Sequence, residues 1–158
     1  MMMESPFRVT VQEPDFDTGA ELDALGRVDC GAVASFVGRV RKGSDDVRAM
    51  TLEHYPAMTE KALNQIMDEA RERWPLLAVR VIHRVGRLLP GEQIVLVAVA
   101  ALHRSEAFAA CEFIMDWLKT KAPFWKKEET PAGSHWVDAR ESDDAAAARW
   151  RLGDGQGG

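Results

Sequence analysis

The stretch from Ser105 to Glu128 (SEAFAACEFIMDWLKTKAPFWKKE) limits most strongly what this chain can fold into. As a helix that ends before Pro123, it is apolar around most of its circumference. Its polar positions form only a narrow stripe: Ser105, Glu112, Asp116 and Lys119. A helix of this composition is too apolar to lie on a surface, so the sequence predicts a long, largely buried helix.

The residues before this helix predict a covered sheet. Ile94 to Leu102 is apolar on both faces, which is typical of a central strand. Pro90 and Gly91 favour a turn before it, so we expect a hairpin with a strand from Ala78 to Arg87. The other expected strands are Phe7–Val11, Gly31–Arg41, Val47–Tyr55, Trp125–Thr130 and His135–Ala139. The other expected helices run from Asp17 or Thr18 to Leu25, from Pro56 to about Trp74, and briefly over Ala145–Trp150.

This irregular alternation of strands and helices indicates an α+β fold class. The 158 residues fit one domain over 1–150, followed by a glycine-rich tail at 151–158 that we expect to be flexible.

Composition narrows the function classes. The formal net charge of −5 argues against binding to nucleic acid or to an anionic membrane, so any basic surface must be local. Two cysteines give no disulfide framework, and the N-terminus does not read as a signal peptide. We therefore expect a cytoplasmic protein. The four histidines lack metal-ligand spacing, and no phosphate-loop or dinucleotide motif occurs, so no metal site is predicted. Cys111, inside the apolar helix, is expected to be a core residue.

A cluster of lysines marks the end of the long helix: Lys119, Lys121, Lys126 and Lys127. In one interpretation Lys119 pairs with Asp116 and complements the helix dipole. In the other, Pro123 turns the chain so that Lys126 approaches Lys119, and the crowded cations favour an uncharged amine that can act as a base or nucleophile. The sequence leaves both interpretations open.

Two further segments are suited to binding an anion. His103-Arg104-Ser105 joins the buried strand to the helix N-terminus, where free backbone N–H groups and Arg104 could hold a phosphate, although Ser105 could also be a simple N-cap. Val37-Gly38-Arg39 combines a glycine that allows close approach with an arginine.

Five runs together resemble the large, catalytic subunits of molybdopterin synthase: GAVASFVGRVR, LEHYPAMTEKAL, VIHRVGRLLPGEQIVLVAVAALHR, FIMDWLKTKAPFWKKE and HWVDARES. They cover about residues 31–150 in order. The resemblance implies an α/β hammerhead fold with an additional small β-sheet subdomain. It implies a sulfurtransferase that converts cyclic pyranopterin monophosphate (precursor Z) to molybdopterin by forming a dithiolene, within molybdenum cofactor biosynthesis. It also implies no cofactor of the chain's own.

The resemblance further implies partners and site residues. The sulfur would come from the thiocarboxylated C-terminal Gly-Gly of a small ubiquitin-like subunit, bound to a homodimer within a heterotetramer. Lys119 and Lys126 match the family's catalytic lysines. The implied substrate-binding residues are Val37, Gly38, Arg39, His103, Arg104, Lys127, Glu128 and Arg140, of which Arg140 could reach a neighbouring protomer.

The sequence leaves two other functions open. A non-catalytic adaptor could bind the ubiquitin-like tail without needing the lysine and arginine cluster. A nucleic-acid binder could use Phe124, Trp125 and the adjoining lysines as a stacking platform, against the net charge.

Overall fold

The computed structural model describes residues 5–137 and 150. Arg140, the tail at 151–158 and all of the expected helix at 145–150 except Trp150 lie outside the described residues. The helices are α1 (Thr18–Leu25), α2 (Pro56–Arg73) and α3 (Arg104–Lys121). The strands are β1 (Phe7–Gln12), β2 (Ala32–Arg39), β3 (Ala49–His54), β4 (Leu76–Arg84), β5 (Gly86–Leu88), β6 (Gln93–Ala101), β7 (Phe124–Thr130) and β8 (Gly133–Val137).

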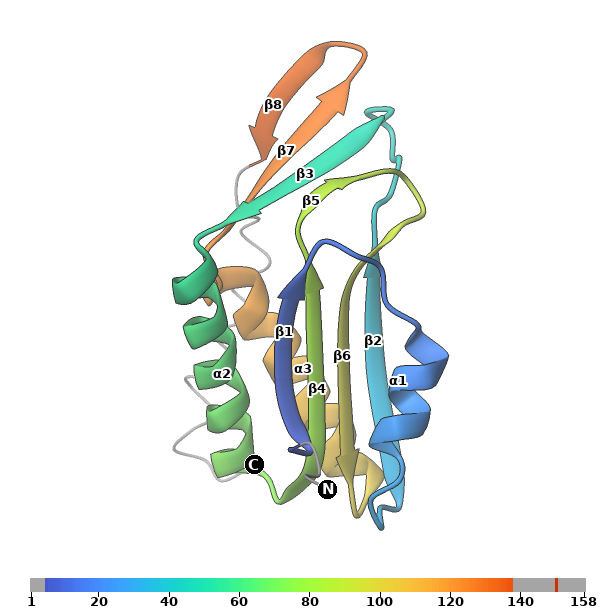
Figure 1. Cartoon of the computed structure of the whole chain (residues 1–158), viewed down its shortest axis with the longest axis vertical. Helices are drawn as coiled ribbons and strands as arrows, with labels where there is room; N and C mark the ends of the chain where they lie inside the picture. The colour runs from blue at the N-terminus through green and yellow to red at the C-terminus, as the bar shows by residue number, and fades with distance from the viewer. Residues whose placement is uncertain (1–4, 138–149, 151–158) are drawn as a thin grey trace.

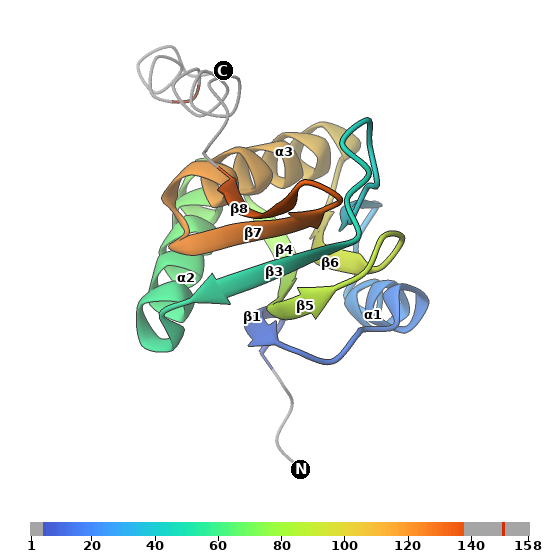
Figure 2. The same cartoon turned by 90° about the horizontal axis from the view of Figure 1, so that it is seen from above.

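The larger sheet has the strand order β1-β4-β6-β2 and helices on both faces (Figures 1 and 2). Alternate residues of β6 point to opposite sides: Val95, Val97 and Val99 pack with α2 and α3, whereas Leu96 and Ala98 pack toward α1. Strand β6 is therefore central and covered on both faces, as its sequence predicted.

A smaller sheet, ordered β5-β3-β7-β8, lies across one end of the larger sheet (Figure 1). Its own core is small and consists of Val40, Leu52 and Leu88, with Met50 and Ile94 packed against them. The predicted fold, with an additional small β-sheet, is confirmed by this arrangement.

The strand expected from Ala78 to Arg87 is in fact two strands. Gly86 has a φ of +91°, a conformation that residues with a side chain rarely adopt, and the chain changes direction there. Strand β4 stays in the larger sheet, where it pairs with β6, while β5 pairs with β3 in the smaller one. This glycine therefore leads the chain from one sheet to the other.

Helix α3 is buried along most of its length, as predicted. Phe113 is fully buried and meets Trp74 and Trp150 edge-to-face, with ring centroids 5.5 Å apart in both pairs. The residue that caps the helix is His103 rather than Ser105. Among the described residues, no helix is long and apolar enough to cross a membrane.

Candidate functional site

A cleft of about 610 Å³ opens where the two sheets meet the C-terminal end of α3. It brings together six of the residues predicted from the sequence, although these come from three separate elements. Val37, Gly38 and Arg39 come from β2, Lys119 from α3, and Lys126 and Glu128 from β7. Lys119 and Lys126 thus line the same cleft, as the turn at Pro123 suggested.

The alternation of β7 separates its two adjacent lysines. Successive side chains of a strand point to opposite faces, so Lys126 and Glu128 face the cleft and Lys127 faces away from it. The ammonium of Lys127 lies 5.8 Å from the ring centre of Trp136, on the outer side of the small sheet. Lys127 therefore does not line this cleft, and its expected contact with substrate stays a prediction.

The same alternation removes the proposed stacking platform. Phe124 stacks on His83 at the cleft, whereas Trp125 meets Tyr55 edge-to-face with ring centroids 4.7 Å apart. Because neighbouring strand residues face opposite ways, Phe124 and Trp125 cannot present one surface to a nucleic acid.

His103 and Arg104 are not part of this cleft. Arg104 begins α3 and Lys119 lies 15 positions later, so a helical rise of 1.5 Å per residue separates them by about 22 Å. The carboxylate of Glu106 accepts a hydrogen bond from the backbone N–H of His103 at 3.3 Å, and therefore already occupies part of the expected anion site. Within one chain, the two halves of the predicted site lie at opposite ends of α3.

The pair between Lys119 and Asp116, which was one of the two interpretations of the lysine cluster, is absent from the described residues. The Asp116 carboxylate accepts a hydrogen bond from the indole N–H of Trp150. Lys119 is exposed in the cleft and, among the described residues, forms no ion pair. Its ammonium group is therefore available to a bound molecule.

Gly38 allows β2 to pass close to β6. A Cβ at this position would lie 2.9 Å from Cγ1 of Val95 and 3.3 Å from the ring of Phe36. The pairing of β2 with β6 also shifts register between Gly38 and Arg39. The Nη1 atom of Arg39 donates to the carbonyl oxygen of Gly91 at 2.8 Å, which holds the guanidinium at the cleft.

The charge of the cleft is opposite to that of the protein. Among its lining residues are five cations, Arg39, Arg41, Lys42, Lys119 and Lys126, against two carboxylates, Asp45 and Glu128. The protein as a whole has a formal charge of −5. This local excess of positive charge suits an anionic ligand.

His83 is a residue of this site that the sequence reasoning missed. It is 4% exposed, lines the cleft and donates from Nδ1 to the carbonyl oxygen of Arg84 at 2.8 Å. Burial, together with smaller contributions from the positive charges of Lys119 and Lys126, lowers the pKa of His83 from 6.5 to about 3. The ring is therefore neutral at physiological pH. A histidine within the otherwise apolar run VIH of a buried strand was the available signal.

Cys111 is a core residue, as predicted. Its thiol donates to the carbonyl oxygen of Val97 at 3.7 Å, and burial raises the pKa of Cys111 to about 11. It therefore supplies no thiolate near neutral pH. Over the described ranges, no three His, Cys, Asp or Glu side chains gather as possible metal ligands.

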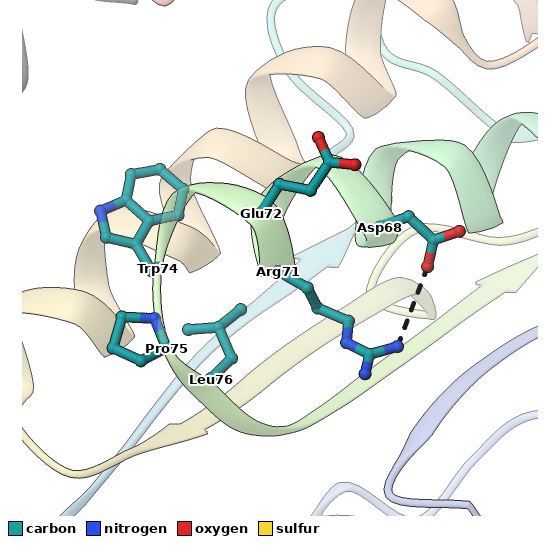
Figure 3. Close-up of a pocket in the computed structure, with 6 residues that line it drawn as sticks. All are labelled: Asp68, Arg71, Glu72, Trp74, Pro75 and Leu76. Atoms are coloured by element: carbon teal, nitrogen blue, oxygen red, sulfur yellow. Dashed lines mark ion pairs between the residues drawn. The ribbon is translucent and has the colours of Figure 1, made fainter.

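A second hollow, of about 390 Å³, lies beside the C-terminal end of α2 (Figure 3). It is lined by Asp68, Arg71, Glu72, Trp74, Pro75 and Leu76. Asp68 and Arg71 pair with each other at 4.0 Å. None of the predicted site residues lies there, so the cleft between the sheets is the candidate site.

The two sheets and the cleft define the class, an α+β protein with a positively charged cleft between its two sheets. A family model described as MoaE protein matches residues 11–121. A molybdopterin synthase catalytic subunit from Ralstonia nicotianae is 63% identical over 148 residues, which are 91% of this chain and 84% of the relative. The Escherichia coli protein of that name is 57% identical over 146 residues, 90% of this chain and 97% of the relative.

Solved structures agree. The molybdopterin biosynthesis MoaE protein from Burkholderia ambifaria superposes with a TM-score of 0.78 at 59% identity, covering 90% of this chain and 97% of that one. A complex of subunits 1 and 2 of the Helicobacter pylori molybdopterin-converting factor shares the fold, with a TM-score of 0.70 at 21% identity over 86% of this chain and 92% of that one. The chain belongs to the MoaE protein family. The resemblance drawn from the sequence, and the prediction of an enzyme, are confirmed.

Proposed function

We propose that this chain converts cyclic pyranopterin monophosphate to molybdopterin, using sulfur from the thiocarboxylated C-terminus of a small ubiquitin-like subunit. The observation that carries the proposal is the cleft in which Lys119 and Lys126 meet from two different elements. The substrate carries a phosphate, and five lining cations against two carboxylates suit such an anion.

The cleft residues divide into roles by their position. Lys119, exposed and without an ion pair among the described residues, would lie beside the thiocarboxylate and assist its attack or the accompanying proton transfers. Lys126 and Arg39 would stabilise the phosphate and the negative charge that develops during the reaction. Gly38 and Val37 would let the substrate approach the β2 backbone. Cys111 offers no thiolate, so a sulfur supplied by a partner is consistent with this site.

A homodimer would complete the site. One chain keeps His103 and Arg104 about 22 Å from Lys119 along α3, given the rise of that helix. A second copy related by a two-fold axis, with its α3 antiparallel to the first, would bring its own His103 and Arg104 to this cleft. Phe108 on α3 is 65% exposed, and Leu102 just before it is 53% exposed, so an apolar surface is available along this helix.

Lys119→Ala tests the reaction. We expect dithiolene formation from precursor Z and thiocarboxylated partner to be lost, with folding and partner binding retained, because only an amine in the cleft is removed. Lys121→Ala is the matched control, because Lys121 lies over the ring of Trp117 at 4.7 Å and not in the cleft. A wild-type chain that binds the partner tail without sulfur transfer would instead indicate an adaptor.

Mixing two inactive variants tests the composite site. When equal amounts of Lys119→Ala and Arg104→Ala chains pair at random, half of the dimers contain one chain of each kind. In each of these mixed dimers, one of the two sites has both wild-type residues. Activity should then return to about a quarter of the wild-type value. No recovery, with subunit exchange verified by mass spectrometry, would refute the contribution of the second copy.

A further inference from the structure

An aromatic contact between His83 and Phe124, both of which line the cleft, joins the two sheets. His83 belongs to β4 of the larger sheet, and Phe124 begins β7 of the smaller one. Their rings stack with centroids 3.8 Å apart and planes inclined by 16°. Since β7 carries Lys126, this contact links the position of a cleft lysine to the larger sheet.

The ring of His83 is fixed by a hydrogen bond as well as by the stack. A carbonyl oxygen only accepts, so the 2.8 Å contact between Nδ1 and the oxygen of Arg84 places the proton on Nδ1. Burial keeps the ring uncharged near neutral pH through the lowered pKa of His83. The His83 ring that stacks on Phe124 therefore keeps the same uncharged form over the physiological pH range.

Phe124 in turn places Lys126. The two residues are two positions apart on β7 and share its inner face. They pair with His54 and Leu52 of β3, and the ring of His54 also contacts Phe124 at a centroid distance of 6.2 Å. A strand is stiff over two residues, so the point at which Phe124 is held determines where Lys126 enters the cleft.

We propose that His83 is a positioning residue, whose stack with Phe124 holds Lys126 at the distance from Lys119 that the reaction requires. The effect on turnover rests on the proposed function, whereas the placement of Lys126 does not. His83 touches neither phosphate nor sulfur in this proposal and acts only through the first residues of β7.

Turnover by the full chain with its thiocarboxylated partner provides the first test. His83→Leu removes the ring, and we expect kcat to fall about tenfold while KM changes less than about threefold, because small displacements of a reacting group are costly. His83→Phe keeps a stacking ring and should lose less than about threefold. Phe124→Leu removes the same stack from the other side and should repeat the effect of His83→Leu, which covers the case in which one variant fails to fold.

A double-mutant cycle separates positioning from general destabilisation. With Lys126→Ala already present, His83→Leu should cause no further loss, because the residue that it positions is gone. Lys127→Ala is the matched background, because Lys127 faces away from the cleft. In that background, His83→Leu should still lower kcat about tenfold. Equal losses in both backgrounds would overturn the proposal.

A second measurement does not depend on activity. Reductive methylation with ¹³C-formaldehyde gives each lysine an NMR signal, and Lys126→Arg and Lys127→Arg assign the two signals of interest. In His83→Leu the Lys126 signal should move and the Lys127 signal should not, and in His83→Phe both should stay in place. An unchanged Lys126 signal in His83→Leu would refute the placement. Absence of turnover in the wild type would refute the proposed function alone.

Discussion

The buried, neutral His83 makes the stability of this protein depend on pH. The pKa of this ring is about 3 in the folded protein, against 6.5 for an exposed histidine, so below pH 6.5 the unfolded chain binds a proton that the folded protein does not. Acid therefore favours unfolding. Between pH 7 and pH 5 this one group should lower the free energy of unfolding by about 2 kcal/mol. This free-energy difference depends little on the pKa of His83 in the folded protein, provided that this pKa is well below 5.

Urea unfolding at both pH values and one protein concentration measures this effect. His83→Phe cannot take up the proton, so its loss between pH 7 and pH 5 should be about 2 kcal/mol smaller than that of the wild type. The variant also leaves the carbonyl of Arg84 without its donor, but that cost is the same at both pH values and cancels in the difference.

A control variant shows whether the effect belongs to His83. His135 is exposed on β8, and His135→Gln should keep the wild-type difference between the two pH values. If His83→Phe and the wild type lost the same stability, within about 0.5 kcal/mol, the assignment of the acid sensitivity to this buried ring would be wrong.

Two other expectations concern single residues. Gly38→Ala should lower the free energy of unfolding by about 1–3 kcal/mol, because its Cβ would lie 2.9 Å from Cγ1 of Val95. Gly19→Ala should be tolerated, because the nearest atom to its Cβ would be 3.5 Å away. Thermal melts that rank the two variants the other way would contradict this expectation. In the folded protein at pH 8, iodoacetamide should modify Cys30 well before Cys111, because burial raises the pKa of Cys111 to about 11. Unfolding in urea should abolish this difference in rate. Equal rates without urea would mean that helix α3 exposes Cys111.

Much of the architecture was readable from local sequence. The apolar circumference of α3 and the two apolar faces of β6 required burial, because each would otherwise expose an unfavourable surface to water. The lysine cluster and the glycine–arginine pair of β2 were recognisable by residue type and spacing. The run of matching motifs then identified the family.

The division of β4 from β5 could not be read in the same way. Val79, Val81 and Val85 lie at alternate positions on one face of an extended chain, so periodicity predicts a single strand through this region. The left-handed conformation of Gly86 separates the strands, and a glycine within a strand pattern is only a weak signal of such a change.

The sequence by itself determined that a buried helix ends in a lysine cluster, which family the chain belongs to, and that Lys119 and Lys126 are the lysines to test. Only the tertiary structure decided which side chains share the cleft. It turned Lys127 away, left His103 and Arg104 at the far end of α3, and placed the neutral ring of His83 against Phe124. The physical reason is that burial and secondary-structure propensity act over a few neighbouring residues, whereas a site is formed by contacts between strands and helices that are distant in the sequence.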